Sequence, residues 1–311
     1  MNRAVHVYSV PLRARFRGIT RRTGLLFEGP AGWGEFCPFE EYGDEEASAW
    51  LACALEAADE GWPAPVRDRV PVNCTVPVVS PERAHEIVKR SGCSTAKVKV
   101  AESTLAEDCA RLEAVRDALG PQGAVRVDAN MMWDVDTAVT AIKAMNRAAG
   151  GLQYVEQPCR TLDELAAVRR KAGVPIAADE SIRKAGDPLK VAVSGAADIA
   201  VIKVAPLGGV RRALEVAEAC GLPCVVSSAL ETSVGMAAGV ALAAALPALD
   251  YACGLATVQL LDGDVTSESL TPVNGFLPVL RQAPKPDRIA EFETGDPVWV
   301  ERFNRVRACA G

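Results

Sequence analysis

The fold is decided by three short stretches of sequence: Val125-Arg126-Val127-Asp128, Gln153-Tyr154-Val155-Glu156 and Ile176-Ala177-Ala178-Asp179. Each stretch is brief, mainly apolar and ends in a carboxylate. Short apolar runs of this kind are typical of parallel strands that are buried on both faces. We therefore expect three neighbouring strands of one parallel sheet.

The same pattern extends through most of the chain, with β-rich runs separated by segments of helical periodicity. Strands that alternate with helices form either a barrel or a doubly wound sheet. No Gly-x-Gly-x-x-Gly or P-loop motif follows the first strand, so we predict an α/β fold, a (β/α)7β TIM-like barrel. The predicted strands are Val70–Thr75, Ala96–Val100, Val125–Asp128, Tyr154–Glu156, Ile176–Asp179, Ile199–Val204, Pro223–Ser227 and Tyr251–Gly254.

The two ends of the chain lack this alternation. Residues 1–68 indicate a small sheet with a turn at Gly29-Pro30-Ala31-Gly32, followed by an acidic helix from about Asp44 to Glu60. Residues 266–311 are rich in proline and irregular. We predict that residues 1–68 and 266–311 together form an α+β capping domain, and that residues 69–265 form the barrel.

Composition argues against several classes of protein. The chain has 311 residues and a formal net charge of −6, which argues against a nucleic-acid partner. No apolar run is long enough to span a bilayer, and the first residues lack the apolar core of a signal peptide. We therefore expect a cytoplasmic protein without membrane partners, acting as a monomer.

Cysteine and histidine usage narrows the chemistry. The ten cysteines form no Cys-x-x-Cys pair, so neither a zinc knuckle nor a redox pair is indicated. The only histidines are His6 and His85, which argues against most chemistry that needs a catalytic or metal-binding histidine. An acid–base group in this protein would have to be Lys, Asp, Glu or Tyr.

The three carboxylates are predicted to share one metal site. A barrel places the carboxyl ends of all its strands on one face, so Asp128, Glu156 and Asp179 should converge there. Their mutual repulsion is costly unless a cation lies between them, and oxygen ligands suit Mg²⁺. Any one of these acids alone would more often be a solvated loop residue at a strand end.

Lysines flank the three acids. Lys97 and Lys99 lie two apart on one predicted strand and so share its face, while Lys203 ends a strand on the opposite side of the ring. A lone strand lysine is more often at an edge or on the surface. Inside a barrel, however, burying an ammonium group costs free energy unless it has a partner or a functional role. Neighbouring positive charge should lower the pKa of Lys99 and allow it to act as a base.

At these residues the sequence resembles the enolase superfamily, and within it the muconate lactonizing enzyme subgroup. The resemblance covers essentially the whole chain, including Gly32-Trp33-Gly34-Glu35 through Pro38 near the N-terminus. The motifs that carry it, in order, are Lys97-x-Lys99, Asp128-x-Asn130, Glu156-Gln157-Pro158, Asp179-Glu180-Ser181 and Lys203.

This resemblance implies roles for the acids and lysines. Asp128, Glu156 and Asp179 would bind Mg²⁺, with Mn²⁺ as the alternative, and the metal would chelate a carboxylate of a small-molecule substrate. Lys99 would remove the proton α to that carboxylate, and the metal would stabilise the enediolate that results. Lys97 and Lys203 complete the implied catalytic set.

Within the subgroup, the stretch from Val226 to Gly235 is most similar to the o-succinylbenzoate synthases, as are Arg126 and the short chain. The implied reaction is a dehydration in menaquinone biosynthesis, the conversion of 2-succinyl-6-hydroxy-2,4-cyclohexadiene-1-carboxylate to 2-succinylbenzoate. Lys99 would return its proton to the departing hydroxide, and protonated Lys203 would stabilise the enediolate by a cation–π contact. The implied substrate-binding residues are Arg126, Asn130, Ser227 and Ser228.

Other interpretations stay open. An N-acylamino acid racemase or dipeptide epimerase would use the same core, and Asp262-Gly263-Asp264 resembles the Asp-x-Asp with which dipeptide epimerases bind an amino group, although a turn is the simpler interpretation. Ser227 and Ser228 could merely cap the next helix. A Schiff-base lyase built on Lys99 or Lys203 and a non-catalytic barrel are further alternatives.

Overall fold

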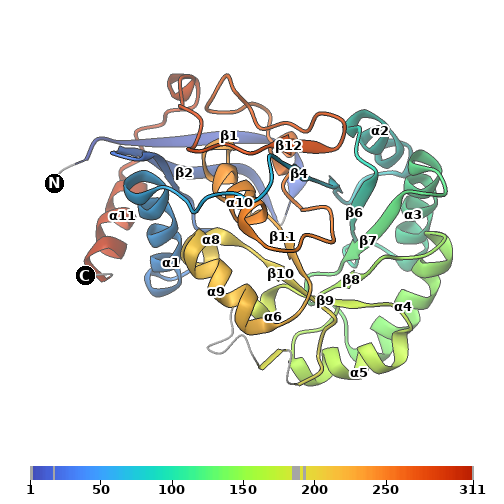
Figure 1. Cartoon of the computed structure of the whole chain (residues 1–311). Coiled ribbons are helices and arrows are strands. Elements are labelled where there is room, and N and C mark those ends of the chain that lie inside the picture. The colour runs from blue at the N-terminus through green and yellow to red at the C-terminus, as the bar shows by residue number, and fades with distance from the viewer. Residues whose placement is uncertain (1–2, 17, 184–189, 192–193, 310–311) are drawn as a thin grey trace.

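The structure is a computed structural model that describes residues 3–16, 18–183, 190–191 and 194–309 (Figure 1). Its centre is a sheet of seven strands in the order β11-β10-β9-β8-β7-β6-β5, in which every neighbouring pair is parallel. Successive strands are neighbours, as repeated right-handed β/α units require. The strands are β5 (Cys74–Val76), β6 (Thr95–Lys99), β7 (Ala124–Asp128), β8 (Val155–Glu156), β9 (Ile176–Ala178), β10 (Ile199–Ile202) and β11 (Cys224–Val226).

The segment 251–254, predicted as the eighth strand, closes this sheet into a barrel. Cys253 forms a parallel bridge with Val72, and Gly254 forms a parallel bridge with Ser227. Backbone hydrogen bonds of 2.7–3.0 Å join the segment to both of its neighbours. The predicted TIM-like barrel is therefore confirmed, with its last strand reduced to short bridges.

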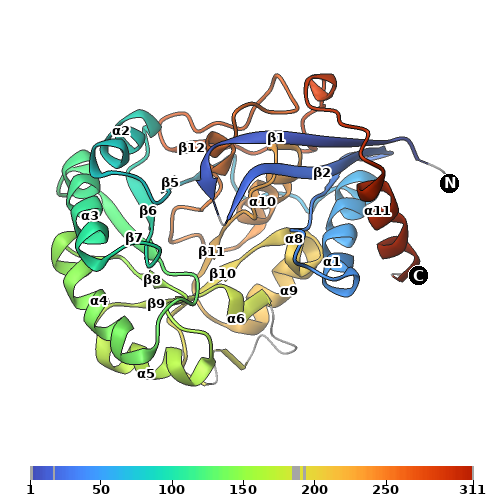
Figure 2. The same ribbon diagram turned by 180° about the vertical axis from the view of Figure 1, so that it is seen from behind.

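Helices follow the strands and cover the outside of the barrel (Figures 1 and 2). Capping boxes begin two of them, at Thr104 with Glu107 and at Thr161 with Glu164. Gly173 ends the second of these helices and Gly221 ends another, each in the left-handed conformation. The helices are α2 (Pro81–Ser91), α3 (Leu105–Leu119), α4 (Val135–Ala148), α5 (Leu162–Ala172), α6 (Glu180–Arg183), α8 (Val204–Leu207), α9 (Val210–Cys220) and α10 (Ser233–Ala245). None of the helices in these described ranges is long and apolar enough to cross a membrane.

The N-terminal residues form an antiparallel sheet of three strands, β1 (Val5–Phe16), β2 (Ile19–Gly29) and β3 (Gly32–Phe36). The predicted turn joins β2 to β3. The predicted acidic helix is α1 (Asp44–Leu55), and its last part, Glu56–Glu60, is a π-helical turn, η1.

The C-terminal tail is more regular than the sequence analysis expected. It contains β12 (Phe276–Pro278), the 3₁₀ turn η3 (Ile289–Glu291) and α11 (Pro297–Cys309). α11 packs beside the N-terminal sheet and α1, with the ring of Phe303 5.8 Å from that of Phe36 (Figure 2).

The first predicted strand is divided into two short ones. β4 (Arg69–Pro71) leaves the barrel and pairs antiparallel with β12, whereas β5 belongs to the barrel. The pairing joins the tail to the barrel, while α11 joins it to the N-terminal sheet. The division into a capping domain of residues 1–68 and 266–311 and a barrel of residues 69–265 stays a prediction.

The inside of the barrel is layered, and this layering positions the site. One small cluster of buried apolar side chains, separate from the main core, lies inside the ring: Tyr154, Ala177, Ile199, Val201 and Val225. Four of these residues precede Glu156, Asp179, Lys203 and Ser227 by two positions each. Residues two apart on a strand face the same way, so the polar residues form a layer above the apolar one, at the carboxyl ends of the strands.

Candidate active site

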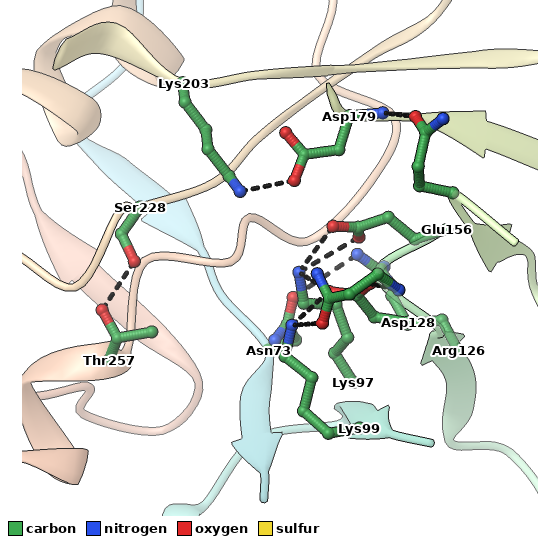
Figure 3. A network of polar contacts seen from close by, with 12 residues as sticks. Asn73, Lys97, Lys99, Arg126, Asp128, Glu156, Asp179, Lys203, Ser228 and Thr257 are labelled. Atoms are coloured by element: carbon green, nitrogen blue, oxygen red, sulfur yellow. Dashed lines mark hydrogen bonds and ion pairs between the residues drawn. The ribbon is translucent and has the colours of Figure 1, made fainter. Parts of the chain in front are cut away.

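Three lysines and three carboxylates meet in the upper layer of the barrel (Figure 3). Lys97 Nζ lies 3.0 Å from both carboxylate oxygens of Glu156, and Lys203 Nζ lies 2.5 Å from Oδ2 of Asp179. Lys99 Nζ donates a short hydrogen bond to Asp128. Each of these six residues is at most 8 % exposed.

Parallel register explains why these residues meet. Lys99 is the register partner of Asp128, and Asp128 is the partner of Glu156. Asp179 and Lys203 directly follow β9 and β10. Neighbouring strands thus bring their last inward-facing residues to one place, as the positions of the acids in the sequence predicted.

Burial and mutual repulsion set the protonation of the acids. Burial and the nearby charge of Asp128 raise the pKa of Glu156 to about 7, against the opposing effect of Lys97. Burial would raise the pKa of Asp128 too, but the ammonium groups of Lys99 and Lys97 hold it well below its ordinary value. The charge of Asp179 also acts to raise the pKa of Glu156, so the three acids share one electrostatic environment.

The pKa values of the two lysines of β6 are shifted in opposite directions. Burial opposes the charged form of Lys97, yet Glu156 and Asp128 hold its pKa above the ordinary value. The pKa of Lys99 is lowered, first by burial and then by the charge of Lys97, against the pull of Asp128. We expected this direction for Lys99 from neighbouring positive charge, but burial is the larger cause.

The donor set at this place suits a hard divalent cation. Its three buried carboxylates, from Asp128, Glu156 and Asp179, end consecutive strands, and oxygen ligands of this kind are those that Mg²⁺ prefers. In the described part of the chain no three Asp, Glu, His or Cys side chains are grouped closely enough to hold a metal ion as they stand. Each carboxylate is turned toward a lysine instead, so the metal-ligand roles stay a prediction.

A small cavity lies directly over these lysines. Its volume is about 30 Å³, which is room for a few water molecules and no more. The N-terminal sheet contributes to its wall, with the Phe16 ring centroid 5.3 Å from Lys99 Nζ. The lining residues are Phe16, Phe39, Thr75, Lys97, Lys99, Asn130, Lys203, Ser227, Ser228, Ala229, Leu230 and Thr257.

Comparison with known proteins places the chain in a family. Residues 80–284 match the family model "Enolase C-terminal domain-like", and residues 7–58 match "Enolase N-terminal domain-like". An o-succinylbenzoate synthase of Thermobifida fusca is 62% identical over 97% of this chain and 95% of its own length. The chain belongs to the o-succinylbenzoate synthase family of the enolase superfamily.

Other relatives agree with this placement. An o-succinylbenzoate synthase of Mycolicibacterium smegmatis is 54% identical over 98% of this chain and 94% of its own length. Among solved structures, the L-Ala-D/L-Glu epimerase of Bacillus subtilis superposes with a TM-score of 0.78 at 25% identity, covering 91% of this chain and 97% of that chain. The family resemblance and the fold expected from the sequence are both confirmed.

Three of the four substrate-binding residues implied by the resemblance line the cavity. Asn130, with a φ of 45°, accepts a hydrogen bond of 2.8 Å from Lys99 Nζ. Ser227 and Ser228 lie across the cavity, and Ser228 Oγ is 2.6 Å from Thr257 Oγ1. Neither serine caps the next helix, since the N-cap of α10 is Thr232.

The fourth residue, Arg126, does not reach the cavity. It precedes Asp128 by two positions, so it lies one layer deeper, and it is fully buried. Its guanidinium donates to Gln153 Oε1 at 2.6 Å, to Tyr154 OH at 3.0 Å and to the carbonyl oxygen of Ala252 at 2.8 Å. In this structure Arg126 braces the inside of the barrel and its donors are engaged by protein acceptors, so its substrate-binding role stays a prediction.

We expect Arg126→Met to lower the free energy of unfolding by about 3 kcal/mol, because it leaves Gln153, Tyr154 and a buried carbonyl without their charged donor. Urea denaturation followed by circular dichroism measures this. Arg212→Met is the matched control, since Arg212 is exposed and pairs only with Glu215 among the contacts that the structure gives it; its effect should stay within about 0.5 kcal/mol. Equal effects of the two variants would contradict the bracing role.

The Asp262-Gly263-Asp264 motif does not face the cavity either. Asp262 is exposed and pairs with Arg13 at 3.2 Å, whereas Asp264 is buried and accepts hydrogen bonds from Ser233 and Ser269. Gly263 has a φ of 133°, which suits a glycine-dependent turn. The motif is therefore a turn, and it supplies no contact for a substrate amino group in this structure.

Sequence reasoning missed several cavity residues. Thr75 lies in β5, the first barrel strand, and is the register partner of Lys97, so the same periodicity could have found it. Phe16, Phe39 and Thr257 lie outside the barrel strands, and the spacing of the sequence gives no signal for them.

Proposed function

We propose that this protein catalyses the dehydration of 2-succinyl-6-hydroxy-2,4-cyclohexadiene-1-carboxylate to 2-succinylbenzoate, a lyase step of menaquinone biosynthesis. The observation that carries the proposal is the pair Lys99 and Lys203, which line one small cavity from β6 and from the end of β10. Membership of the o-succinylbenzoate synthase family supports the choice of substrate. We further propose that it works in the cytoplasm, as a monomer.

We propose that Asp128, Glu156 and Asp179 hold a divalent cation, Mg²⁺ with Mn²⁺ as the alternative. When bound, the cation would supply positive charge that binds the substrate carboxylate and stabilises negative charge developing beside it. The three acids are buried, end consecutive strands and repel one another, as the raised pKa of Glu156 indicates. A cation would relieve that repulsion.

The proton transfers belong to the lysines. Neutral Lys99 takes the proton α to the carboxylate, and the C–H electron pair forms the enediolate. The C–O bond to the ring hydroxyl then breaks, and Lys99 returns the proton to the leaving group, which departs as water. Burial lowers the pKa of Lys99 and so favours the neutral form that this first step needs.

Lys203 and Lys97 have supporting roles. Lys203 Nζ, held by Asp179, places a positive charge on the other side of the cavity, where it stabilises the enediolate. Lys97 stays charged between Glu156 and Asp128 and keeps these acids in place. Asn130 accepts from Lys99 Nζ and orients it, and Ser227 and Ser228 lie where they would meet the succinyl chain.

The test is a spectrophotometric assay of the purified protein with the cyclohexadiene substrate, with Mg²⁺ and with EDTA. We expect rapid aromatisation with Mg²⁺, a fall of at least about 10²-fold with EDTA, and recovery when excess Mg²⁺ is added. Turnover that is unchanged in EDTA would contradict the metal assignment.

The same lysine pair could move a proton from one face of a carbon to the other, as a racemase or epimerase would. Incubation of N-acylamino acids and dipeptides in D₂O distinguishes the two functions. Deuterium incorporation at Cα, without turnover of the cyclohexadiene, would favour the epimerase function and contradict the dehydratase.

A further inference from the structure

The N-terminal sheet contacts the loop after β11 through one buried arginine. Arg22 of β2 is 2 % exposed, and its Nε donates to the carbonyl oxygen of Leu230 at 3.0 Å. Its Nη2 donates to the carbonyl oxygen of Ala229 at 3.3 Å and, by a short hydrogen bond, to that of Cys37. One guanidinium thus joins β2, the segment after β3 and the loop after β11.

The loop that Arg22 holds is part of the cavity wall and has an unfavourable backbone conformation. Ser228, Ala229 and Leu230 all line the cavity. Leu230 has a φ of +68°, a left-handed conformation that costs a branched side chain free energy and persists only where its surroundings fix it. The hydrogen bond from Arg22 to the Leu230 carbonyl oxygen fixes it here.

The far end of the loop is fixed by a second residue of the same sheet. Glu35 of β3 accepts hydrogen bonds from the backbone N–H of Thr232 at 3.1 Å and from that of Gly235 at 2.8 Å. It also accepts from Thr232 Oγ1 and from Tyr8 OH, each at 2.5 Å. A buried carboxylate at these N–H groups caps the first turn of α10. Glu35 therefore fixes the end of the loop and the start of the helix.

Arg22 also contacts a second part of the cavity lining. Its guanidinium carbon lies 4.4 Å from the centroid of the Phe39 ring, and Phe39 lines the cavity. The same side chain therefore contacts both Phe39 and the Ala229–Leu230 part of the cavity lining. A lysine could not do this, since an ammonium group lacks the planar fork that reaches three carbonyl oxygens at once.

We propose that Arg22 is a positioning residue for substrate binding, which fixes the conformation of the Ser228–Leu230 wall beside Phe39. The inference rests on the proposed function, because it assumes that the cyclohexadiene substrate binds against this wall. The volume of about 30 Å³ does not hold that substrate, so the cavity must widen when the substrate binds. Arg22 reaches no proton-transfer group through any contact in the described structure, so it acts on binding and not on the proton transfers.

The experiment compares Arg22→Lys and Arg22→Met with the wild type. We expect KM for the cyclohexadiene substrate to rise about tenfold in Arg22→Lys and further in Arg22→Met, with kcat within about threefold of wild type. The dissociation constant of 2-succinylbenzoate, measured by calorimetry, should rise by the same factor as KM.

Arg116→Lys is the matched control. Arg116 also donates to several backbone carbonyl oxygens, including those of Ala149, Gly120 and Gly123, but at the other end of the barrel. This variant should lower the melting temperature and leave KM unchanged. An equal rise of KM in both arginine variants would reduce the role of Arg22 to general stability and overturn the proposal, as would an unchanged KM in Arg22→Lys.

Hydrogen exchange separates this proposal from the proposed function. In Arg22→Lys, amides of residues 227–232 should exchange at least about tenfold faster than in the wild type, while peptides of β6 and β7 exchange at the same rate. Unchanged exchange in 227–232 would overturn the positioning role even if the wild type is active. A wild type that does not turn over the cyclohexadiene, with faster exchange in the variant, would contradict the proposed function alone.

Discussion

We expect Lys99→Ala to lower kcat by at least about 10³-fold, because it removes the group that takes the α-proton and returns it to the leaving hydroxide. The fold should be retained, since Asp128 keeps Lys97 as an ionic neighbour at 3.6 Å. Steady-state kinetics measure the loss, and circular dichroism and the melting temperature check the fold. Near-wild-type turnover would contradict the assignment of the base.

Lys143→Ala is the control for this variant, because Lys143 is exposed on α4 and is not among the residues that line the cavity. It should change neither kcat nor stability measurably. In the wild type, kcat/KM should rise with pH and level off once Lys99 is neutral. Because burial lowers the pKa of Lys99 below 10.5, that plateau should begin at a lower pH than for an ordinary lysine.

The second large effect is expected for Asp179→Asn, which keeps the shape of the side chain and removes its charge. We expect the dissociation constant for Mg²⁺ to rise about 10²-fold, because a divalent cation is bound more weakly when one of its ligands loses its negative charge. The rate at saturating Mg²⁺ should fall as well, since Lys203 loses its anionic partner. Calorimetric Mg²⁺ titration and the Mg²⁺ dependence of kcat measure the two effects.

Asp264→Asn provides the comparison for Asp179→Asn. Asp264 is also buried and hydrogen-bonded, but it contacts Ser233 and Ser269 outside the cavity. Its substitution should cost stability and leave the Mg²⁺ affinity unchanged. If both variants weaken Mg²⁺ binding equally, the loss reflects general destabilisation and the role of Asp179 as a ligand is contradicted.

Much of the barrel could be predicted from sequence because its strands obey simple rules. Buried parallel strands are short apolar runs, and residues two apart on a strand share a face, so the end residues Asp128, Glu156 and Lys203 could be assigned to one place. The C-terminal tail was harder to predict. Trp299, Phe303 and Val306 have the spacing of one helix face in α11, but neighbouring prolines obscured the pattern.

The site was predictable only in part, and for a physical reason. Arg126 was assigned to substrate because it resembled a family motif, although the two-residue period that placed Asp128 also places Arg126 one layer deeper. Phe16 and Phe39 depend on how the N-terminal sheet packs on the barrel, and no local pattern encodes that packing. Leu230 owes its left-handed backbone to Arg22, which is 208 residues away in the chain.

The cavity wall and the proton-transfer groups come from different parts of the chain. Phe16 and Phe39 belong to the N-terminal segment and Ser228–Leu230 to one loop, while Lys99, Asp128 and Lys203 stand on barrel strands. Selection for a new substrate can therefore act on a few wall positions without disturbing the reactive lysines. A mutant library restricted to these positions would explore substrate range while its members inherit the same chemistry, which makes this fold a favourable starting point for directed evolution.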